Sequence, residues 1–406
     1  MSPIDYNAEA IAGAIKVHAP GVVALLPQWC AINSGSTNLV GLGLMRLELE
    51  RHFSTLPVRM DIIPLGPEET LDGQPLLVGH ALRFTCRPEA EEQLFLCGHY
   101  DTVYEESHAF QQGQWLDANT FNAPGAIDMK GGLLTLLLAL RAFEELPGHD
   151  RLGWELLIVP DEEIGSPGSI PLLREVATRH RLALVFEPAM SNGNCVRRRM
   201  GVGSFQATVT GRAAHTGRDF ANGRNAIAAL SRFLLKVEAL NSEFPQAIFN
   251  TGFMSGGGAV NVVPDTAVAR FNMRVEKVDD IPPIRARVAQ LVEAANREDG
   301  IKLEWRGSFN RPPKEINPAT EAMFRLYQSC ALEHGVSLDW TDSGGGSDGS
   351  NLAAAGITTL DGVGPRGGNL HSEREYILVD SIAERAAIAT SFMNAVAEGA
   401  LHALKE

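Results

Sequence analysis

The chain has 406 residues, 45% of them hydrophobic and 21% charged, which is typical of a soluble globular protein with more than one core. Its formal net charge of −14 argues against binding to nucleic acid or to an anionic membrane. The longest apolar run, Leu133–Leu140, is too short to span a membrane, no signal-peptide pattern is visible, and the five cysteines are scattered. We therefore expect a cytoplasmic protein with reduced thiols and no membrane association.

The first part of the chain alternates helical and strand patterns. Apolar residues at three-to-four spacing predict helices over 6–30, 38–54 and 167–180, and a long apolar helix that begins after Asp128 and ends near Leu146. Apolar runs predict strands at 58–63, 76–86, 94–97, 154–160 and 182–186. This alternation predicts an α/β fold with a mainly parallel sheet that is flanked by helices.

The pattern changes near Gly201. Residues 204–209, 223–240, 248–254, 266–276, 284–297 and 301–306 predict strand, helix, strand, strand, helix and strand. This order is the ferredoxin-like unit. After residue 310 the first pattern returns, with helices at 317–334 and from 379, and strands at 336–340 and 357–361. We therefore expect a discontinuous catalytic domain of residues 1–200 and 309–406, with an inserted α+β domain of residues 201–308. Arg197–Arg199, near the junction, are expected to be a solvated or hinge cluster.

Three predicted apolar strands each end in a histidine or an acid. His99 and Asp101 follow the first, Asp161–Glu163 the second, and Glu187 the third. Open α/β sheets bind ligands at the carboxyl ends of their strands. Asp128, at a helix start, and His371, after a later strand, can join these residues. One kind of nitrogen ligand and several carboxylates, without cysteine, suit zinc or a similar divalent ion.

A count of charges favours two metal ions. Asp128, Glu163 and Glu187 supply three negative ligands, and one hydroxide supplies a fourth, which together balance two divalent cations. Two neutral histidines complete the ligand shells, Glu162 is left free to move a proton, and Asp101 can hold His99 by its second nitrogen. Taken singly, each residue also has an ordinary explanation, such as a helix cap at Asp128 or a solvated turn at residues 162–163. One metal site accounts for all these positions together.

At this point the sequence resembles the dinuclear zinc exopeptidases and amidohydrolases, a family that includes aminoacylase, acetylornithine deacetylase, succinyl-diaminopimelate desuccinylase and bacterial glutamate carboxypeptidase. It looks most like the glutamate carboxypeptidase branch. The matching stretches, in the family's order, are Gly98–Val103, Gly125–Gly132, Asp161–Ser166, Phe186–Pro188, Gly211–Gly217, Gly344–Asp348 and His371–Glu373.

The resemblance implies a role for each matching position. His99 and Glu187 would hold one zinc ion, Glu163 and His371 would hold the other, and Asp128 would bridge them. Glu162 would be the general base, and Asp101 would orient His99. The remaining implied roles belong to the inserted domain: His215 would enter the partner subunit's site and stabilise the oxyanion, and Asn261 and Arg274 would hold the substrate carboxylate.

The chain departs from the family's pattern at Met129, where relatives commonly have a second Asp. In relatives the peptide bond after the bridging Asp is cis, and Met129 leaves that isomer open here. Strand periodicity alone places Arg274 on the polar face of its strand, where it can be a carboxylate clamp or an ordinary solvated arginine.

The resemblance implies a homodimeric hydrolase that contains two divalent ions, with zinc expected and cobalt or manganese as alternatives. A metal-bound hydroxide, with Glu162 as general base, would cleave the amide of an N-acyl amino acid or of a short peptide that ends in a Glu-like or Asp-like residue. An N-acyl-amino-acid deacylase is the alternative.

Two hypotheses from other classes remain. One is a serine hydrolase that uses Ser347 with Asp361 and His371, because Gly345–Gly349 fits the G-x-S-x-G pattern. The other is a binding protein without catalysis. Neither the acyl group, nor the amino acid released, nor the role of Asp161 can be deduced from the sequence.

Overall fold

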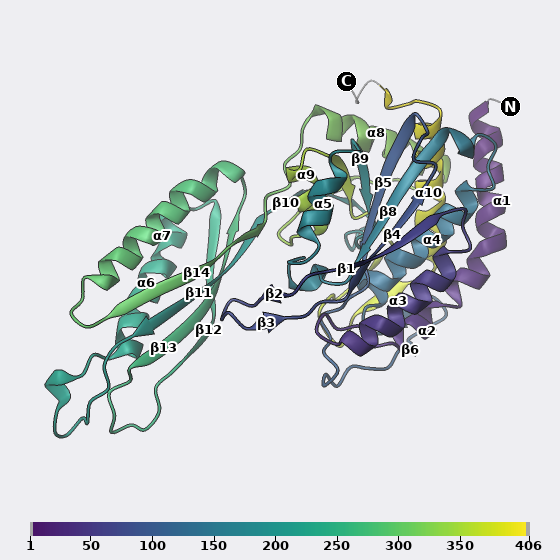
Figure 1. Ribbon diagram of the computed structural model, residues 1–406. Helices are drawn as coiled ribbons and strands as arrows, with labels where there is room; N and C mark the ends of the chain where they lie inside the picture. The colour runs from purple at the N-terminus through teal and green to yellow at the C-terminus, as the bar shows by residue number, and fades with distance from the viewer. Residues whose placement is uncertain (1–2, 403–406) are drawn as a thin grey trace.

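The computed structural model describes residues 3–402, with side chains from residue 8, and shows a large part and a smaller part that are joined near β10 and β14 (Figure 1). The large part contains an eight-stranded sheet in the order β1-β4-β8-β5-β9-β16-β10-β15. The strands are β1 Arg59–Pro64, β4 His80–Cys86, β5 Glu92–His99, β8 Leu152–Val159, β9 Leu182–Val185, β10 Cys195–Arg199, β15 Trp340–Ser343 and β16 Thr358–Asp361. The central strands β8, β5, β9 and β16 run parallel, as do β10 and β15, and the other neighbours are antiparallel.

Helices cover both faces of this sheet. One face carries α1 Pro3–Val23, α2 Leu26–Cys30, α3 Leu39–Phe53, α4 Gly131–Phe143, α8 Pro318–Glu333 and α10 Asp380–Ala397. The other face carries α5 Ile170–Val176 and α9 Asp348–Ala354. Every residue of α4 except Arg141 is buried, because α4 lies between the sheet and helices α1 and α10. The mainly parallel α/β sheet predicted from the sequence is confirmed.

The smaller part is a four-stranded antiparallel sheet in the order β12-β13-β11-β14, with two helices packed on one face (Figure 1). Its elements are β11 Gly201–Thr210, α6 Ala226–Glu243, β12 Ala247–Gly256, β13 Thr266–Val275, α7 Ile281–Asn296 and β14 Lys302–Arg311. This is the ferredoxin-like order. Its core contains Phe205, whose ring stacks on Phe271 and Trp305 at centroid distances of 5.7 and 5.2 Å.

The chain leaves and re-enters the large part through two segments that pair with each other. The backbone N–H of Arg199 donates to the carbonyl of Lys314 at 3.2 Å, and the N–H of Lys314 donates to the carbonyl of Arg199 at 3.0 Å. The buried Lys314 ammonium also donates to the carbonyls of Val196 and Arg197. The two parts are therefore connected by a short antiparallel ribbon.

A two-stranded hairpin and a small four-stranded sheet complete the fold. β2 Glu68–Glu69 and β3 Pro75–Leu76 form a hairpin that projects from the large part toward the smaller one (Figure 1). A second four-stranded sheet, in the order β17-β18-β7-β6, combines β6 Gln114–Trp115, β7 Thr120–Asn122, β17 Gly367–Gly368 and β18 Tyr376–Leu378. This sheet joins the segment before Asp128 to the segment after His371.

Several predicted boundaries were wrong. The helix expected over 6–30 is broken after Val23, and α2 starts a new first turn that accommodates Pro27. The strand expected over 76–86 is interrupted at Gly79, where a Cβ would lie 2.8 Å from Pro160. Helix 167–180 shortens to α5. The strand expected at 336–340 begins only at Trp340.

Arg197–Arg199 form the end of β10 in the large sheet, so the expectation of a solvated cluster is wrong for Arg199, although Arg198 is exposed. Arg199 is buried and makes a two-point ion pair with Asp361, at 2.7 and 2.8 Å. This strand was not predicted from the sequence, because three of its five residues are arginines and it contains no apolar run.

One segment, Ala8–Cys30, is long and apolar enough to cross a membrane by length and composition alone, with 28% of the most apolar window buried. This is weak evidence, because the core helix of a soluble protein passes the same test. Its apolar residues are interspersed with polar ones, so the segment contains no long uninterrupted apolar run.

Candidate metal centre

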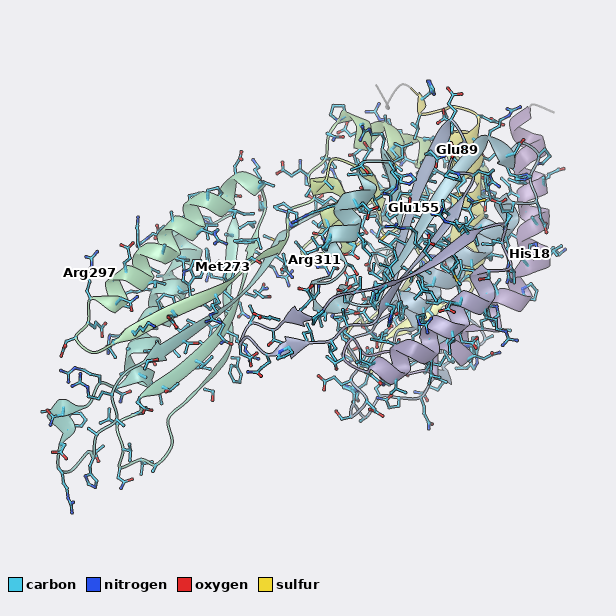
Figure 2. The ribbon with its side chains drawn as sticks, in the orientation of Figure 1. His18, Glu89, Glu155, Met273, Arg297 and Arg311 are labelled. Carbon is cyan, nitrogen blue, oxygen red and sulfur yellow. The ribbon has the colours of Figure 1, made fainter. Side chains whose placement is uncertain are left out.

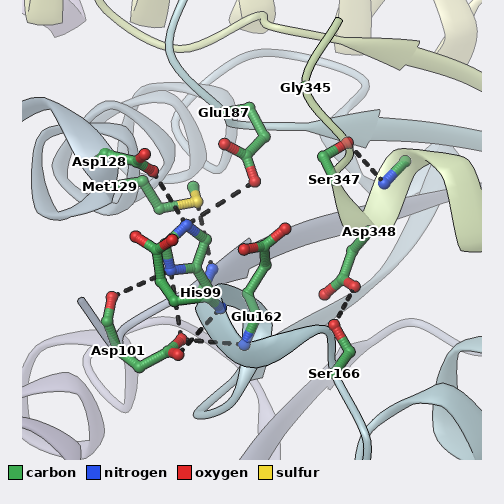
Figure 3. A network of polar contacts seen from close by, with 12 residues as sticks. His99, Asp101, Asp128, Met129, Glu162, Ser166, Glu187, Gly345, Ser347 and Asp348 are labelled. Atoms are coloured by element: carbon green, nitrogen blue, oxygen red, sulfur yellow. Dashed lines mark hydrogen bonds and ion pairs between the residues drawn. The ribbon is translucent and has the colours of Figure 1, made fainter. Parts of the chain in front are cut away.

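The predicted ligand residues meet at the carboxyl edge of the large sheet. His99 is the last residue of β5, Glu162 and Glu163 begin the 3-10 turn after β8, and Glu187 follows β9 shortly afterwards. Asp128 lies in the turn that leads into α4, and the Asp128–Met129 peptide bond is cis. His371 approaches from a loop after β17 and has a left-handed backbone conformation, with φ of 58°. Figure 3 shows His99, Asp128, Glu162 and Glu187 directed toward one another.

The Asp128 carboxylate lies between two histidines. One oxygen, Oδ1, is 3.1 Å from His99 Nε2, and the other, Oδ2, is 3.3 Å from His371 Nε2. Each histidine then has a second carboxylate beside the same nitrogen. His99 Nε2 is 3.7 Å from Glu187 Oε1, and His371 Nε2 is 3.4 Å from Glu163 Oε2. The arrangement is two histidine–glutamate pairs that share one aspartate.

These residues fit a pair of divalent cations. Ligand atoms of His99, Asp128 and Glu163 lie within 4.8 Å of one another, as do those of His99, Glu162 and Glu187. Glu163 Oε1 is buried and has no hydrogen-bond partner in the described chain. Burial, and then the neighbouring Asp128, raise the pKa of Glu163 to about 8, because this crowd of acids contains too little positive charge. Two imidazoles and three carboxylates are a donor set that zinc and similar ions accept.

Asp101 connects the histidine to the acidic turn. His99 Nδ1 lies 3.1 Å from the backbone carbonyl of Asp101 and 3.3 Å from its carboxylate. That carboxylate accepts the backbone N–H groups of Glu162 and Glu163, each at 3.1 Å, and the hydroxyl of Ser36 at 2.7 Å. Asp101 thus fixes the imidazole and the two glutamates relative to each other, as a residue behind a metal ligand does.

Glu162 has surroundings that differ from those of the other acids. Its side chain is buried, and Oε1 lies 2.8 Å from Nη2 of Arg311. Burial raises the pKa of Glu162 to about 7, and the Arg311 guanidinium opposes this shift. A carboxylate that titrates near neutral pH is suited to accept and return a proton.

Asp161 braces the turn. Its buried carboxylate accepts the backbone N–H of Gly168 at 2.7 Å, together with the N–H and the hydroxyl of Ser169. Burial raises the pKa of Asp161 to about 7. The three consecutive acids therefore have three different environments, and that of Asp161 is structural.

The sequence reasoning missed Glu375, which supports Asp128 from behind. This fully buried carboxylate accepts the backbone N–H groups of Ile127 and Asp128, at 3.0 and 3.2 Å, and the hydroxyl of Tyr104 at 2.7 Å. No sequence signal marked it, since it stands between exposed residues in a polar loop. Met129 is also part of this support, because its sulfur accepts the backbone N–H of His99 at 3.2 Å.

Three predicted residues of the smaller part lie away from this cluster. His215 and Asn261 are exposed and belong to the loops that follow β11 and β12. Figure 1 shows that these loops lie at the end of the small sheet remote from the large one. In residues 3–402, no hydrogen bond or ion pair joins either to the cluster. Arg274 lies nearer the junction, where its guanidinium donates to the carbonyl of Gly344.

The serine hydrolase alternative is wrong, because Ser347 is a helix cap. Its hydroxyl donates to Asp361 at 2.6 Å and accepts the backbone N–H of Gly349 at the start of α9 (Figure 3). Asp361 is paired with Arg199, and His371 faces Asp128 and Glu163. Within the described chain no histidine hydrogen-bonds Ser347, so the proton acceptor that a nucleophilic serine requires is missing.

The family model described as "Peptidase family M20/M25/M40" matches residues 95–395, which contain all five predicted ligands. The chain belongs to this family. M20 enzymes are metal-dependent peptidases and amidohydrolases, and the chain is accordingly a metal-dependent hydrolase of this class.

Curated relatives of the M20 chain include both a carboxypeptidase and a deacylase. Carboxypeptidase G2 from Pseudomonas sp. (strain RS-16) is 25% identical over 315 residues, which cover 76% of this chain and 75% of the relative. Succinyl-diaminopimelate desuccinylase from Nitrosospira multiformis is 27% identical over 272 residues, which cover 64% of this chain and 70% of the relative.

Solved M20 structures share the fold. Human carnosine dipeptidase 1 superposes with a TM-score of 0.75 at 15% identity, covering 96% of this chain and 99% of that one. The Bacillus subtilis YXEP protein, described as a dinuclear metal-binding peptidase of the M20 family, superposes with a TM-score of 0.63 at 12% identity, covering 93% and 99%. At these identities the likeness establishes the fold alone.

Proposed function

We propose that the protein hydrolyses the amide bond of an N-acyl amino acid, or of a short peptide that ends in a Glu-like or Asp-like residue, as a glutamate carboxypeptidase does. The observation that carries this proposal is the Asp128 carboxylate between His99 and His371, with the buried Glu162 beside them. The similarity to carboxypeptidase G2 supports this substrate class. A deacylase that releases a small acid is the second candidate, supported by the similarity to succinyl-diaminopimelate desuccinylase.

In the proposed site, His99 and Glu187 would hold one divalent ion, Glu163 and His371 would hold the other, and Asp128 would be shared by both. When bound, such ions supply Lewis-acid chemistry, acidifying a water molecule and polarising a carbonyl group. Zinc suits the ligand set best, and cobalt and manganese share its preferences. Asp101 fixes the positions of His99, Glu162 and Glu163 relative to one another through the hydrogen bonds described above.

Glu162 carries the proton in the proposed reaction. Its carboxylate accepts a proton from the attacking water and returns it to the nitrogen of the leaving amine, so that the amide is replaced by a carboxylate and an amine. Because Glu162 is buried and tied to Arg311, its carboxylate is held at a fixed place at the edge of the cluster.

The smaller part is proposed to complete the site. We assign it to residues 201–308, inserted in a catalytic domain of residues 1–200 and 309–406. In this proposal Arg274 and Asn261 bind the free carboxylate of the substrate, and His215 acts from a second subunit of a homodimer. The exposed position of His215, remote from the cluster of its own chain, is consistent with a role in a partner subunit.

A cytoplasmic location is proposed on the basis of the cysteines. All five are free and buried, which is typical of proteins from reducing compartments.

The proposal is tested with purified protein loaded with zinc, cobalt or manganese, and a panel of N-acyl and N-aroyl amino acids in which the amino acid is varied first. Preference for glutamate or aspartate supports the carboxypeptidase assignment, and preference for a basic or neutral amino acid supports the deacylase. Two variants separate the roles of the adjacent acids. Glu162→Gln should retain both metals and reduce kcat by about 10²–10⁴-fold. Glu163→Ala should lose metal. A fully active Glu162→Gln variant, or two metals retained in Glu163→Ala, would contradict the assignment.

A further inference from the structure

Arg311 links the smaller part of the molecule to the proposed general base. It is the last residue of β14 and pairs with Val202 of β11, so its backbone belongs to the four-stranded sheet. Its side chain nevertheless points into the large part, where it is 6% exposed. Figure 2 shows Arg311 at the junction of the two parts.

The guanidinium reaches three groups around the acidic turn. Nη2 lies 2.8 Å from Oε1 of Glu162 and also donates to the backbone carbonyl of Glu162. Nη1 lies 3.2 Å from Oδ1 of Asp348, which in turn accepts the hydroxyl of Ser166, the residue that ends the turn. Arg311 therefore holds both the carboxylate and the backbone of Glu162, while Asp348 holds Arg311.

The ion pair with Arg311 restricts the conformation of the Glu162 side chain. A glutamate has three rotatable side-chain bonds, and among residues 8–402 Arg311 is the one side chain that forms an ion pair with the Glu162 carboxylate. A planar guanidinium fixes a carboxylate more closely than a lysine does, because its donors are arranged in a rigid fork. A displacement of about 1 Å in a catalytic group can reduce the rate about 10²-fold.

We infer that Arg311 is a positioning residue, which orients the Glu162 carboxylate for proton transfer and ties that orientation to the strand that returns from the inserted domain. This inference rests on the proposed role of Glu162. In this role Arg311 does not contact metal. Its replacement should therefore change the rate of the chemical step and not the affinity for substrate.

The experiment compares Arg311→Ala, Arg311→Lys and the matched control Arg306→Ala in the full-length, metal-loaded protein. Arg306 lies on the same strand, is exposed and has no contact with Glu162. We expect Arg311→Ala to reduce kcat about 10²-fold with KM unchanged within about threefold, and Arg311→Lys to fall between Arg311→Ala and wild type. Both should retain two metals per chain, and Arg306→Ala should behave as wild type. If Arg311→Ala does not fold, Arg311→Lys decides the question.

Two further measurements separate positioning from a merely structural role. Millimolar guanidinium should restore part of the kcat of Arg311→Ala without affecting wild type. The double variant Glu162→Gln with Arg311→Ala should be no slower than Glu162→Gln alone, because no carboxylate remains to be oriented. Additive losses would overturn the inference, as would a raised KM with unchanged kcat, which would indicate substrate binding. Losses of activity that parallel losses of metal would also overturn it.

These outcomes distinguish the failure of the inference from the failure of the proposed function. If Glu162→Gln is fully active, the proposed mechanism fails. If Glu162→Gln is inactive and Arg311→Ala is normal, the mechanism stands and the positioning role alone is wrong.

Discussion

Glu375 hydrogen-bonds to the backbone of Asp128 and not to its carboxylate, yet replacing Glu375 should weaken the whole metal centre. Its carboxylate accepts two backbone N–H groups around Asp128 and one tyrosine hydroxyl, and all of them are buried. Glu375→Ala leaves the two N–H groups without an acceptor, whereas the Tyr104 hydroxyl keeps the carbonyl of Ser372, at 2.9 Å. Each unsatisfied buried group destabilises by about 1–3 kcal/mol, so for two such groups we expect a loss of about 2–6 kcal/mol in the free energy of unfolding of the metal-free protein.

The same change should also reduce metal affinity. Removing a group that orients a ligand typically weakens metal binding by about 10–100-fold, and Asp128 is placed between both histidines, so both proposed ions should be affected. Glu375→Gln should be milder, because its carbonyl oxygen can still accept the two N–H groups. The exposed Glu373, two residues earlier in the same loop, provides the control Glu373→Gln.

The assay combines urea unfolding of chelator-treated protein with competition for zinc against a chelating dye. We expect both measurements to follow the order wild type, Glu375→Gln, Glu375→Ala, with Glu373→Gln unchanged. A Glu375→Ala protein with wild-type zinc affinity would refute the view that these hydrogen bonds fix the position of Asp128.

Three shorter predictions concern removal of the metals, the buried carboxylate of Glu155 and the helix cap Ser347. Chelation should lower the melting temperature and zinc should restore it, since free metal at about 1,000 times its Kd stabilises by about 4 kcal/mol; an unchanged melting temperature would argue against bound metal. Although burial opposes it, His180 and Arg179 hold the pKa of Glu155 at about 2, below its unfolded value of about 4.3. The stabilisation that results from this low pKa is therefore complete above about pH 5 and is lost as the pH falls toward 2. Glu155→Gln should be less stable than wild type by about 2 kcal/mol at pH 7, and this difference in the free energy of unfolding should become smaller on acidification. Urea titrations at several pH values test this, and a constant difference would contradict it. Ser347→Ala should lose about 1 kcal/mol as a helix cap and retain amide hydrolysis, whereas an inactive, fully metallated variant would revive a serine mechanism.

The sequence was most informative where chemistry and strand periodicity coincide. His99, Glu163 and Glu187 stand at the ends of apolar strands, and the edge of a parallel sheet necessarily brings such residues together. The bridging role of Asp128 was implied by the family resemblance alone, whereas the charge count indicated only two ions; in the structure the Asp128 carboxylate lies between His99 and His371.

Residues whose importance depends on tertiary contacts could not be found in this way. Arg311 and Glu375 sit in polar stretches, and only the folded chain shows that both are buried against the acidic turn or the Asp128 turn. Strand β10 was missed for a related reason. Arg199 pairs with Asp361 and Arg197 lies 5.6 Å from the centroid of the Trp340 ring, and neither contact leaves a local sequence pattern. The helix break before Pro27 was visible in principle, because proline fits only the first turn of a helix.

The backbone bonds between Arg199 and Lys314 limit how the two parts of the molecule can move. Two single strands side by side would swivel independently, but a hydrogen-bonded ribbon resists stretching and resists bending within its own plane. It remains compliant to bending out of that plane and to twisting. The ribbon therefore restricts the smaller part to few kinds of movement relative to the large part, and it defines the hinge axis for them. Arg311 lies three residues before Lys314 on the returning segment. Any rotation about this axis therefore also moves the side chain that forms the ion pair with Glu162.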